Sequence, residues 1–340
     1  AKECASYYVK VLDEHLPRAV DVLSDLLLNP AFADEDIYRE QNVVVEEIKM
    51  VEDTPDDLVY EIFTTRFWPE HQLGTRILGT AESVRSFDAA ALRTYFSDAY
   101  TAQNLVIAAA GNIDHAAISA LVGNAFSALP VSSQSVETTK QTVNIQLEIR
   151  EKDLEQAHIC LGTRGYEHTH PDRHASYILN AVLGGSMSSR LFQKIREKRG
   201  LAYAVSSGLT SYRDVGSLTV YAGCDGGAVR QVIDLVVEEM ETLKQHPLAD
   251  IELQRAKDHL RGSFVLGQES TTSRMSQLAR SEMYFGRQID VSETLKAIDL
   301  VSQEDVQRVA CDLFQKGALA GTVVGPLTRA DVDASQLDLS

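Results

Sequence analysis

The feature that most constrains the fold of this 340-residue chain is an internal repeat. A strand-like segment followed by an amphipathic helix occurs at 4–12 and 16–28, and again at 218–224 and 228–243. Such self-similarity indicates that one supersecondary unit has been duplicated. The sequence therefore predicts an α+β fold with two tandem homologous αβ domains, each with a sheet covered by helices.

The boundary between the two copies is predicted in a polar segment, PVSSQSVETTKQ at 130–141, because it is poor in apolar residues and resembles a linker. The first domain then covers 1–129 and the second 142–340. Four elements of the second copy have no counterpart in the first: strands at 143–150 and 157–162, expected to pair with each other, and helices at 172–183 and 188–198. The first domain is therefore expected to be incomplete, and the chain to be truncated at its N-terminus.

Local signals predict the remaining elements. Asp88 suits the N-cap of a helix that runs to about Ala99, and Thr54-Pro55 begins a helix that continues to Phe67. Further helices are predicted at 34–51 and 115–129, and a strand at 105–110.

The composition argues against several classes of protein. A net charge of −17 and a pI near 4.9 make nucleic acid an unsuitable main partner. The longest apolar run, 105–110, is far shorter than the ~18 to 20 residues of a membrane span. The four cysteines are widely spaced with no CxxC pair, which is typical of reduced thiols in a cytoplasmic protein.

The helix at 37–51 carries two carboxylates at unusual positions. At about 100° per residue, Glu40 and Glu47 fall inside an apolar arc. That arc consists of Ile37, Val43, Val44, Ile48, Met50 and Val51. A carboxylate in a core-facing stripe needs compensation, for which a metal ion or a cationic partner is usual. The alternatives are two partly exposed glutamates at the rim of the core, or a structural ion pair with an arginine.

The repeat bears on these alternatives. At the offset that aligns Arg39 with Arg255, Ala256 stands opposite Glu40 and Ser263 opposite Glu47. Only the first copy therefore carries the two carboxylates. This asymmetry is expected of a duplicated fold with one catalytic half, and it favours a functional site on the helix at 37–51.

Several stretches resemble one family of peptidases. They are DEHLPRAVDVLSDLLLNPAF, REQNVVVEEIKMVEDTPDDLV, RILGTAESVRSF, residues 100–112, and GGSMSSRLFQKIREKRGLAYAVSS at 184–207. On these stretches the chain resembles the pitrilysin/insulinase family of zinc peptidases, in the branch of the mitochondrial processing peptidase. The resemblance implies two homologous domains that form half of a clamshell. It also implies a zinc-dependent endopeptidase that cuts unfolded peptides in an enclosed chamber, as a homodimer or as a heterodimer with a related subunit.

The resemblance assigns candidate site residues. Glu47 matches a distal zinc ligand of the family, and Glu40 matches a second acidic position that supports the site. Arg196 and Tyr203 match an arginine and a tyrosine that contact the substrate, and both types can donate hydrogen bonds to a peptide carbonyl. Without the resemblance, Arg196 is interpreted as a surface residue of a helix, and Tyr203 as a strand residue packed in the core.

The sequence departs from the family at its main motif. None of the nine histidines lies in an HxxEH or HExxH sequence, and the family places HxxEH roughly 70 to 80 residues before Glu47. One interpretation is a truncated enzyme, inactive as given and with weak or no zinc binding. Another is a non-catalytic partner subunit that presents peptides to an active one. A third is a core subunit of a membrane respiratory complex, against which the lack of a membrane-docking stretch argues. Retention of Glu40, Glu47, Arg196 and Tyr203 favours the truncated enzyme.

Overall fold

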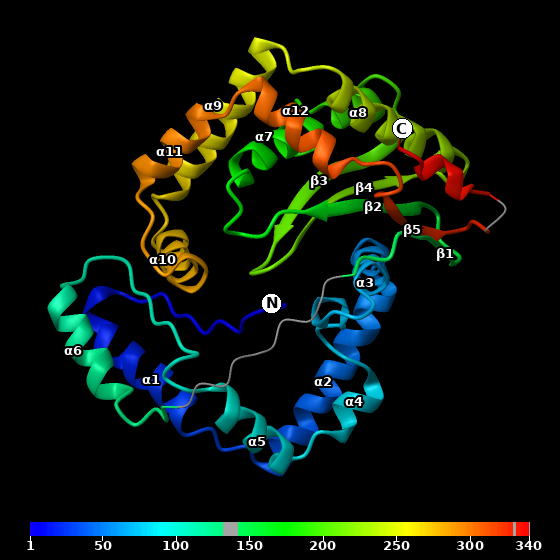
Figure 1. Ribbon diagram of the computed structural model, residues 1–340. Helices are drawn as coiled ribbons and strands as arrows, with labels where there is room; N and C mark the ends of the chain where they lie inside the picture. The colour runs from blue at the N-terminus through cyan, green and yellow to red at the C-terminus, as the bar shows by residue number, and fades with distance from the viewer. Residues whose placement is uncertain (132–141, 329–330, 340) are drawn as a thin grey trace. The chain divides into compact units, whose positions relative to one another are not determined.

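The computed structural model describes residues 1–131, 142–328 and 331–339, so most of the predicted linker at 130–141 lies outside the described residues (Figure 1). The chain forms two compact units. One comprises the described residues of Ala1–Lys49, Ile77–Thr138 and Leu266–Gln288, and the other those of Met50–Arg76, Thr139–Val265 and Ile289–Ser340. Each unit draws on separate stretches of chain. Compactness therefore does not test the boundaries of the repeat, which stay predictions.

The second unit is built on a five-stranded sheet. Its strands are β1 (Leu147–Glu151), β2 (Ala157–Gly165), β3 (Ala202–Ser211), β4 (Gly216–Cys224) and β5 (Ala320–Gly325), in the spatial order β1-β5-β2-β4-β3. β1 runs parallel to β5, and the other neighbours are antiparallel. The predicted pairing of 143–150 with 157–162 is therefore wrong, because β5 lies between β1 and β2. An apolar pattern specifies which face of a strand is buried, but not which strand lies beside it.

Helices cover both faces of this sheet, which confirms the predicted α+β class. The helices α7 (Arg173–Leu183), α8 (Val229–Gln245) and α12 (Gln303–Leu313) pack together on one face, and α3 (Pro55–Phe67) packs on the other (Figure 1). β2 and β4 are buried almost throughout, as expected of strands that are covered on both sides. Also in this unit are α11 (Val291–Leu300) and most of α9 (Asp250–Gly267).

One glycine permits the close approach of α3 to the sheet. A Cβ atom on Gly162 of β2 would lie only 2.6 Å from Cζ of Phe63 and 3.0 Å from the carbonyl oxygen of Leu218. Phe63 and Phe67 of α3 stack on each other, with ring centroids 5.1 Å apart, and belong to the apolar cluster between α3 and the sheet. The absence of a side chain at Gly162 therefore makes room for the aromatic face of α3.

The first unit is mainly helical. It contains α1 (Leu16–Leu28), most of α2 (Asp34–Asp53), α4 (Ala81–Ser86), α5 (Ala89–Ala99), α6 (His115–Ala125) and α10 (Thr271–Phe285). The predicted N-cap at Asp88 is confirmed, because its Oδ1 accepts a hydrogen bond from the backbone N–H of Ala91 at 2.8 Å. The helix predicted at 115–129 ends earlier, at Ala125.

The strands predicted at 4–12 and 105–110 are not formed. Both segments lack regular secondary structure, and within the described residues of this unit no strand ladder is present. Val9 and Ile107 are accordingly exposed, at 39% and 44%. A β-branched segment becomes a strand only when a partner satisfies its backbone N–H and C=O groups, and local sequence does not supply that partner.

Of the helices that the structure describes, none combines the length and the apolar composition that a bilayer span requires.

Candidate functional site

Arg196 and Tyr203 lie together in the second unit. Arg196 is in the π-helix η3 (Phe192–Glu197), and Tyr203 is the second residue of β3. Nε of Arg196 donates a hydrogen bond to the carbonyl oxygen of Tyr203 at 3.0 Å, and its Cζ lies 5.8 Å from the centroid of the Tyr203 ring. The structure thus brings together the two candidate residues of the second sequence copy.

Tyr203 occupies a β-bulge. Ala202 pairs with Cys224 and Ala204 with Gly223, so Tyr203 is the extra residue on its strand. Its side chain is 81% exposed, whereas Ala202 is buried. The interpretation of Tyr203 as a packed core residue is therefore wrong. The bulge directs its phenol ring into solvent, and nothing in the local sequence marks a bulge at this residue.

A tight turn joins η3 to β3. Gly200 has a φ of +59°, a left-handed conformation that glycine adopts without strain. The N–H of Gly200 donates to the carbonyl of Arg196 at 3.0 Å, and the N–H of Leu201 donates to that of Ile195, also at 3.0 Å. These bonds close the end of the π-helix and hold Arg196 against the start of β3.

Some hydrogen-bond donors of the Arg196 guanidinium are used within the chain, and others remain available. Its Cζ lies 4.8 Å from the ring centroid of Phe192, and one Nη1 hydrogen bond goes to Oε1 of Glu197 at 2.6 Å. Within the described residues, neither Nη2 of Arg196 nor the hydroxyl of Tyr203 makes a hydrogen bond. Two donors on neighbouring residues are therefore free to bind an acceptor such as a peptide carbonyl.

Glu40 and Glu47 lie on α2, in the first unit, and both are exposed. The predicted apolar arc around them is only partly covered: Val43 is 47% and Met50 62% exposed, and its other four residues are half-buried. Among the described residues, neither glutamate makes an ion pair or hydrogen bond, so the predicted alternative of a structural pair with an arginine is not formed there. The alternative of exposed glutamates describes this part of the chain.

The described residues do not provide enough ligands to bind a zinc ion. Zinc takes about four ligands, of which three or four come from the protein. In the part of the chain that the structure describes, no three His, Cys, Asp or Glu side chains gather where they could hold a metal. Glu40 and Glu47 are two helical turns apart, roughly 10 Å along the axis. The described residues around α2 therefore offer at most these two carboxylates, fewer than the three protein ligands that zinc needs.

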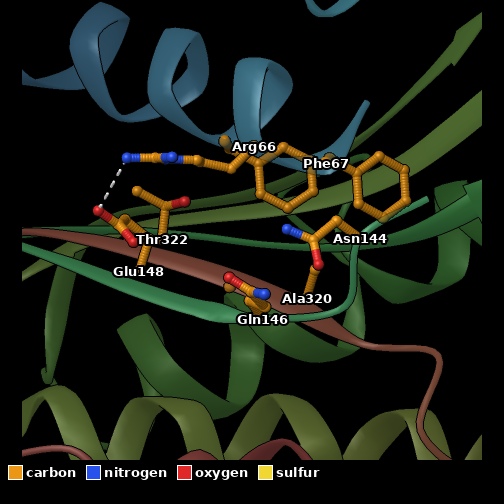
Figure 2. Close-up of a pocket in the computed structure, with 9 residues that line it drawn as sticks. Arg66, Phe67, Asn144, Gln146, Glu148, Ala320 and Thr322 are labelled. Atoms are coloured by element: carbon orange, nitrogen blue, oxygen red, sulfur yellow. Dashed lines mark ion pairs between the residues drawn. The ribbon is translucent and has the colours of Figure 1, made fainter. Parts of the chain in front are cut away.

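A small hollow in the second unit is a weaker candidate (Figure 2). It lies between α3 and the strands β1 and β5, where Arg66 pairs with Glu148 at 3.6 Å. Thr322 is 1% exposed, and its Oγ1 has no hydrogen-bond partner among the described residues. The space is that of about one water molecule, so it suits a buried water that bonds to Thr322, not a substrate.

Sequence reasoning missed a group of ionised residues beside Arg196. Arg190 lies just before η3 and Lys194 lies within it, four positions later. Both side chains face Glu239 of α8. Glu239 is only 8% exposed. The available signal was its place in the apolar stripe of α8, among residues such as Val236 and Leu243 that are buried.

Two protein families match the chain. Residues 1–81 match the family described as "Insulinase (Peptidase family M16)", and residues 86–260 match "Peptidase M16 inactive domain". The second range includes both Arg196 and Tyr203.

Curated relatives match over most of their length. The chain is 40% identical to the uncharacterized zinc protease YmxG of Bacillus subtilis over 314 residues, which are 92% of this chain and 76% of that protein. It is 38% identical to an uncharacterized zinc protease of Streptomyces coelicolor over 346 aligned residues, covering 99% of this chain and 74% of that protein.

Solved structures share the fold. The M16 inactive domain from Pseudomonas fluorescens matches with a TM-score of 0.83 at 23% identity, over 91% of this chain and 74% of that one. A protease from Helicobacter pylori also has a TM-score of 0.83, at 18% identity, over 92% and 78%. A chain of complex III2 from Candida albicans reaches 0.82 at 18% identity, over 96% and 80%. At these identities the likeness concerns the fold alone.

Proposed function

Because this chain belongs to the insulinase family of peptidases (family M16), we propose that it serves the zinc-dependent hydrolysis of unfolded peptides. The relatives at 38% to 40% identity are named zinc proteases, which supports the reaction class. The finer proposal is an endopeptidase of the processing-peptidase branch that encloses its substrate in a chamber. We further propose that it is cytoplasmic and works as a homodimer or with a related subunit, without nucleic acid or membrane as a partner.

The observation that carries this proposal is the arrangement of Arg196 and Tyr203. A bulge exposes the phenol, a π-helix presents the guanidinium beside it, and both keep a free donor. Peptide hydrolysis develops negative charge on the carbonyl oxygen of the scissile bond. In the proposed role, the Tyr203 hydroxyl donates to that oxygen, and Arg196 binds a neighbouring backbone carbonyl or a terminal carboxylate of the peptide.

In the same proposal Glu47 is one protein ligand of the zinc ion, and Glu40 orients the groups around it. When bound, zinc supplies an activated water molecule. The histidines and the general base would come from outside these 340 residues, since none of the nine histidines here lies in HxxEH. Exposed carboxylates without a partner among the described residues are consistent with this assignment.

A second candidate is a non-catalytic partner subunit that holds peptides for an active one. The observation behind it is the pair of available donors on Arg196 and Tyr203, which can bind a peptide without any metal. Both candidates use Arg196 and Tyr203 to bind a peptide, but only the enzyme needs Glu47.

Metal analysis and peptidase assays on the protein as its own cells make it would separate the two. The enzyme should contain zinc and cleave a quenched fluorescent peptide in a chelator-sensitive manner. Glu47→Gln should then lose most of the zinc, while Glu40→Gln should retain metal with affinity weakened ~10 to 100-fold. Peptide binding without cleavage or zinc would favour the partner subunit. Equal zinc in Glu47→Gln and the parent would refute Glu47 as a ligand.

A further inference from the structure

Arg196 is held in place by a segment of unusual geometry. π-Helices are rare and occur mostly as single turns inside α-helices, frequently at functional sites. The η3 segment closes with a bond from the N–H of Lys198 to the carbonyl of Gln193 at 3.0 Å, five residues back. Something must stabilise this turn against the ordinary α-helical one, and the contacts of its side chains show what does.

Glu239 of α8 bridges two cations of this segment. Its Oε1 accepts a hydrogen bond from Nζ of Lys194 at 2.7 Å, and its Oε2 lies 3.7 Å from Nη1 of Arg190. Glu239 is buried, so its charge is compensated by these partners and not by water. One carboxylate therefore fixes both ends of the segment 190–194, which ends two residues before Arg196.

The two cations have further partners of their own. Arg190 makes a bidentate pair with Glu252 of α9, at 2.8 and 2.7 Å. The hydrogen bonds that Arg190 donates to Glu252 raise the pKa of Arg190. Burial lowers the pKa of Lys194, but its bonds to Glu239 and Glu238 outweigh that effect and leave the pKa raised. Arg190 and Lys194 therefore stay protonated at neutral pH, and their ion pairs tie this segment to α8 and α9.

From this geometry we infer that Glu239 is a positioning residue, which sets the turn of η3 and thereby presents Arg196 beside Tyr203. In the described part of the chain, Glu239 makes no hydrogen bond or ion pair with either residue, and it acts through Lys194 and Arg190. The consequence for peptide binding rests on the proposed function, whereas the consequence for Arg196 itself does not.

Glu239→Gln is the direct test, because it keeps the size of the side chain and removes its charge. A glutamine can accept from Lys194 only by turning its NH₂ group toward the Arg190 guanidinium, where two donors would oppose each other. Glu238→Gln is the matched control. Glu238 precedes Glu239 on α8 and also pairs with Lys194, at 3.0 Å, but its side chain is 60% exposed.

The first readout follows Arg196 without any enzymatic assay. In ¹⁵N-arginine-labelled chain, the Nε–H of Arg196 exchanges slowly with water while it donates to the Tyr203 carbonyl. Arg196→Lys assigns the resonance. Glu239→Gln should speed this exchange roughly 10-fold or more, and Glu238→Gln should change it less than about 2-fold. Unchanged exchange in Glu239→Gln would overturn the inference.

A second variant separates positioning from stability. Replacing Lys194 and Glu239 together by methionine removes the buried pair without leaving a lone charge, an exchange that buried ion pairs often tolerate. The double variant should fold like the parent yet keep the fast Arg196 exchange. A double variant with parental exchange would mean that the charges serve stability alone. This comparison also decides the question if Glu239→Gln fails to fold.

The second readout concerns peptide binding in the natural protein. Glu239→Gln should weaken the affinity for an unfolded fluorescent peptide roughly 10-fold, or raise KM more than it lowers kcat, at unchanged zinc content. Fast exchange with unchanged peptide affinity would leave the positioning role standing and refute the proposed use of Arg196 in peptide binding. The two failures are therefore distinguishable.

Discussion

Helices α2 and α8 place carboxylates among apolar residues by the same sequence pattern, yet the two helices treat them in opposite ways. On α8, Glu239 is 8% exposed and lies between two cations. On α2, Glu40 and Glu47 are exposed and have no ionic partner among the described residues. A carboxylate within an apolar stripe can therefore be treated in two ways. The protein neutralises its charge with cationic side chains, or it leaves the carboxylate exposed and available for a ligand.

The surroundings of the two helices explain the difference. The apolar stripe of α8 is covered by the sheet and by α12, and Val232 and Leu243 on either side of Glu239 are buried. Of the apolar residues on α2, only Val45 is buried, and it lies outside the arc that contains the glutamates. A buried charge is stable only when it is paired, whereas water solvates an exposed charge without a partner.

The largest expected effect is on stability at the compensated site. Glu239→Ala should lower the free energy of unfolding by about 3 kcal/mol, because it leaves Lys194 without its buried partner, while Arg190 keeps Glu252. Urea unfolding of the 340-residue chain measures this. Glu238→Ala is the control and should cost less than about 0.5 kcal/mol. An equal loss of unfolding free energy in the two variants would contradict the distinction between buried and exposed carboxylates.

The next largest effect is expected on catalysis, for substitutions beside η3 that leave α2 unchanged. In the natural protein, Tyr203→Phe should lower kcat at least ~10-fold at unchanged zinc content, since it removes one donor to the developing oxyanion and leaves α2 untouched. Arg196→Ala should weaken substrate binding more visibly, because its cationic donor also helps in the ground state. Pre-steady-state turnover of a quenched peptide, with metal analysis beside it, measures both. If Tyr203→Phe kept the parental kcat, the hydroxyl of Tyr203 would have no role in catalysis.

His174 of α7 is a half-buried ionisable group whose charged form has no compensating hydrogen bond at Nδ1 among the described residues. Burial and the nearby charge of Arg173 lower the pKa of His174 to about 4, and its Nδ1 has no hydrogen-bond partner among the described residues. The fold favours the neutral ring, so stability should be full above about pH 6.5 and decline as the pH falls toward 4. The loss should be about 1 kcal/mol, given partial contact with solvent. His174→Gln should flatten the pH dependence of chemical unfolding over this range; an unchanged slope would contradict the assignment.

The smallest expected effect is on α2. Glu40→Ala and Glu47→Ala should each change the free energy of unfolding by less than about 0.5 kcal/mol in the 340-residue chain, as exposed substitutions usually do. Thermal and urea unfolding would both serve. A loss above about 1 kcal/mol in either variant would show that the protein does compensate that carboxylate, and would weaken its assignment as a ligand.

Sequence patterns predicted most helices because their ends carry local chemistry. Pro55 opens α3 as expected, and Asp88 caps α5. The strands were less predictable because their partners are remote in sequence. The segment 105–110 has the composition of a strand but no ladder within the described residues, and β5 separates two strands that seemed to form a pair.

The candidate site shows the same limit. The resemblance indicated Arg196 and Tyr203, and the structure places them in contact, but the bulge that exposes Tyr203 depends on its pairing with β4 and leaves no local mark. Glu239 could have been found, because it violates the apolar stripe of its helix as Glu40 and Glu47 do. Its partners could not, because Arg190 and Lys194 reach it only through the tertiary fold.

The position of β5 makes the order of synthesis matter. Ala320–Gly325 lies between β1 and β2, which are complete more than 150 residues earlier in the chain. On the ribosome, β1 and the edge of β2 that pairs with β5 therefore stay without this neighbour until more than 150 further residues have been made. Contacts between such distant segments carry a high loop-closure cost and slow folding. During that interval the exposed edges can pair with other nascent chains, and the pairing of β5 with both strands ends that exposure.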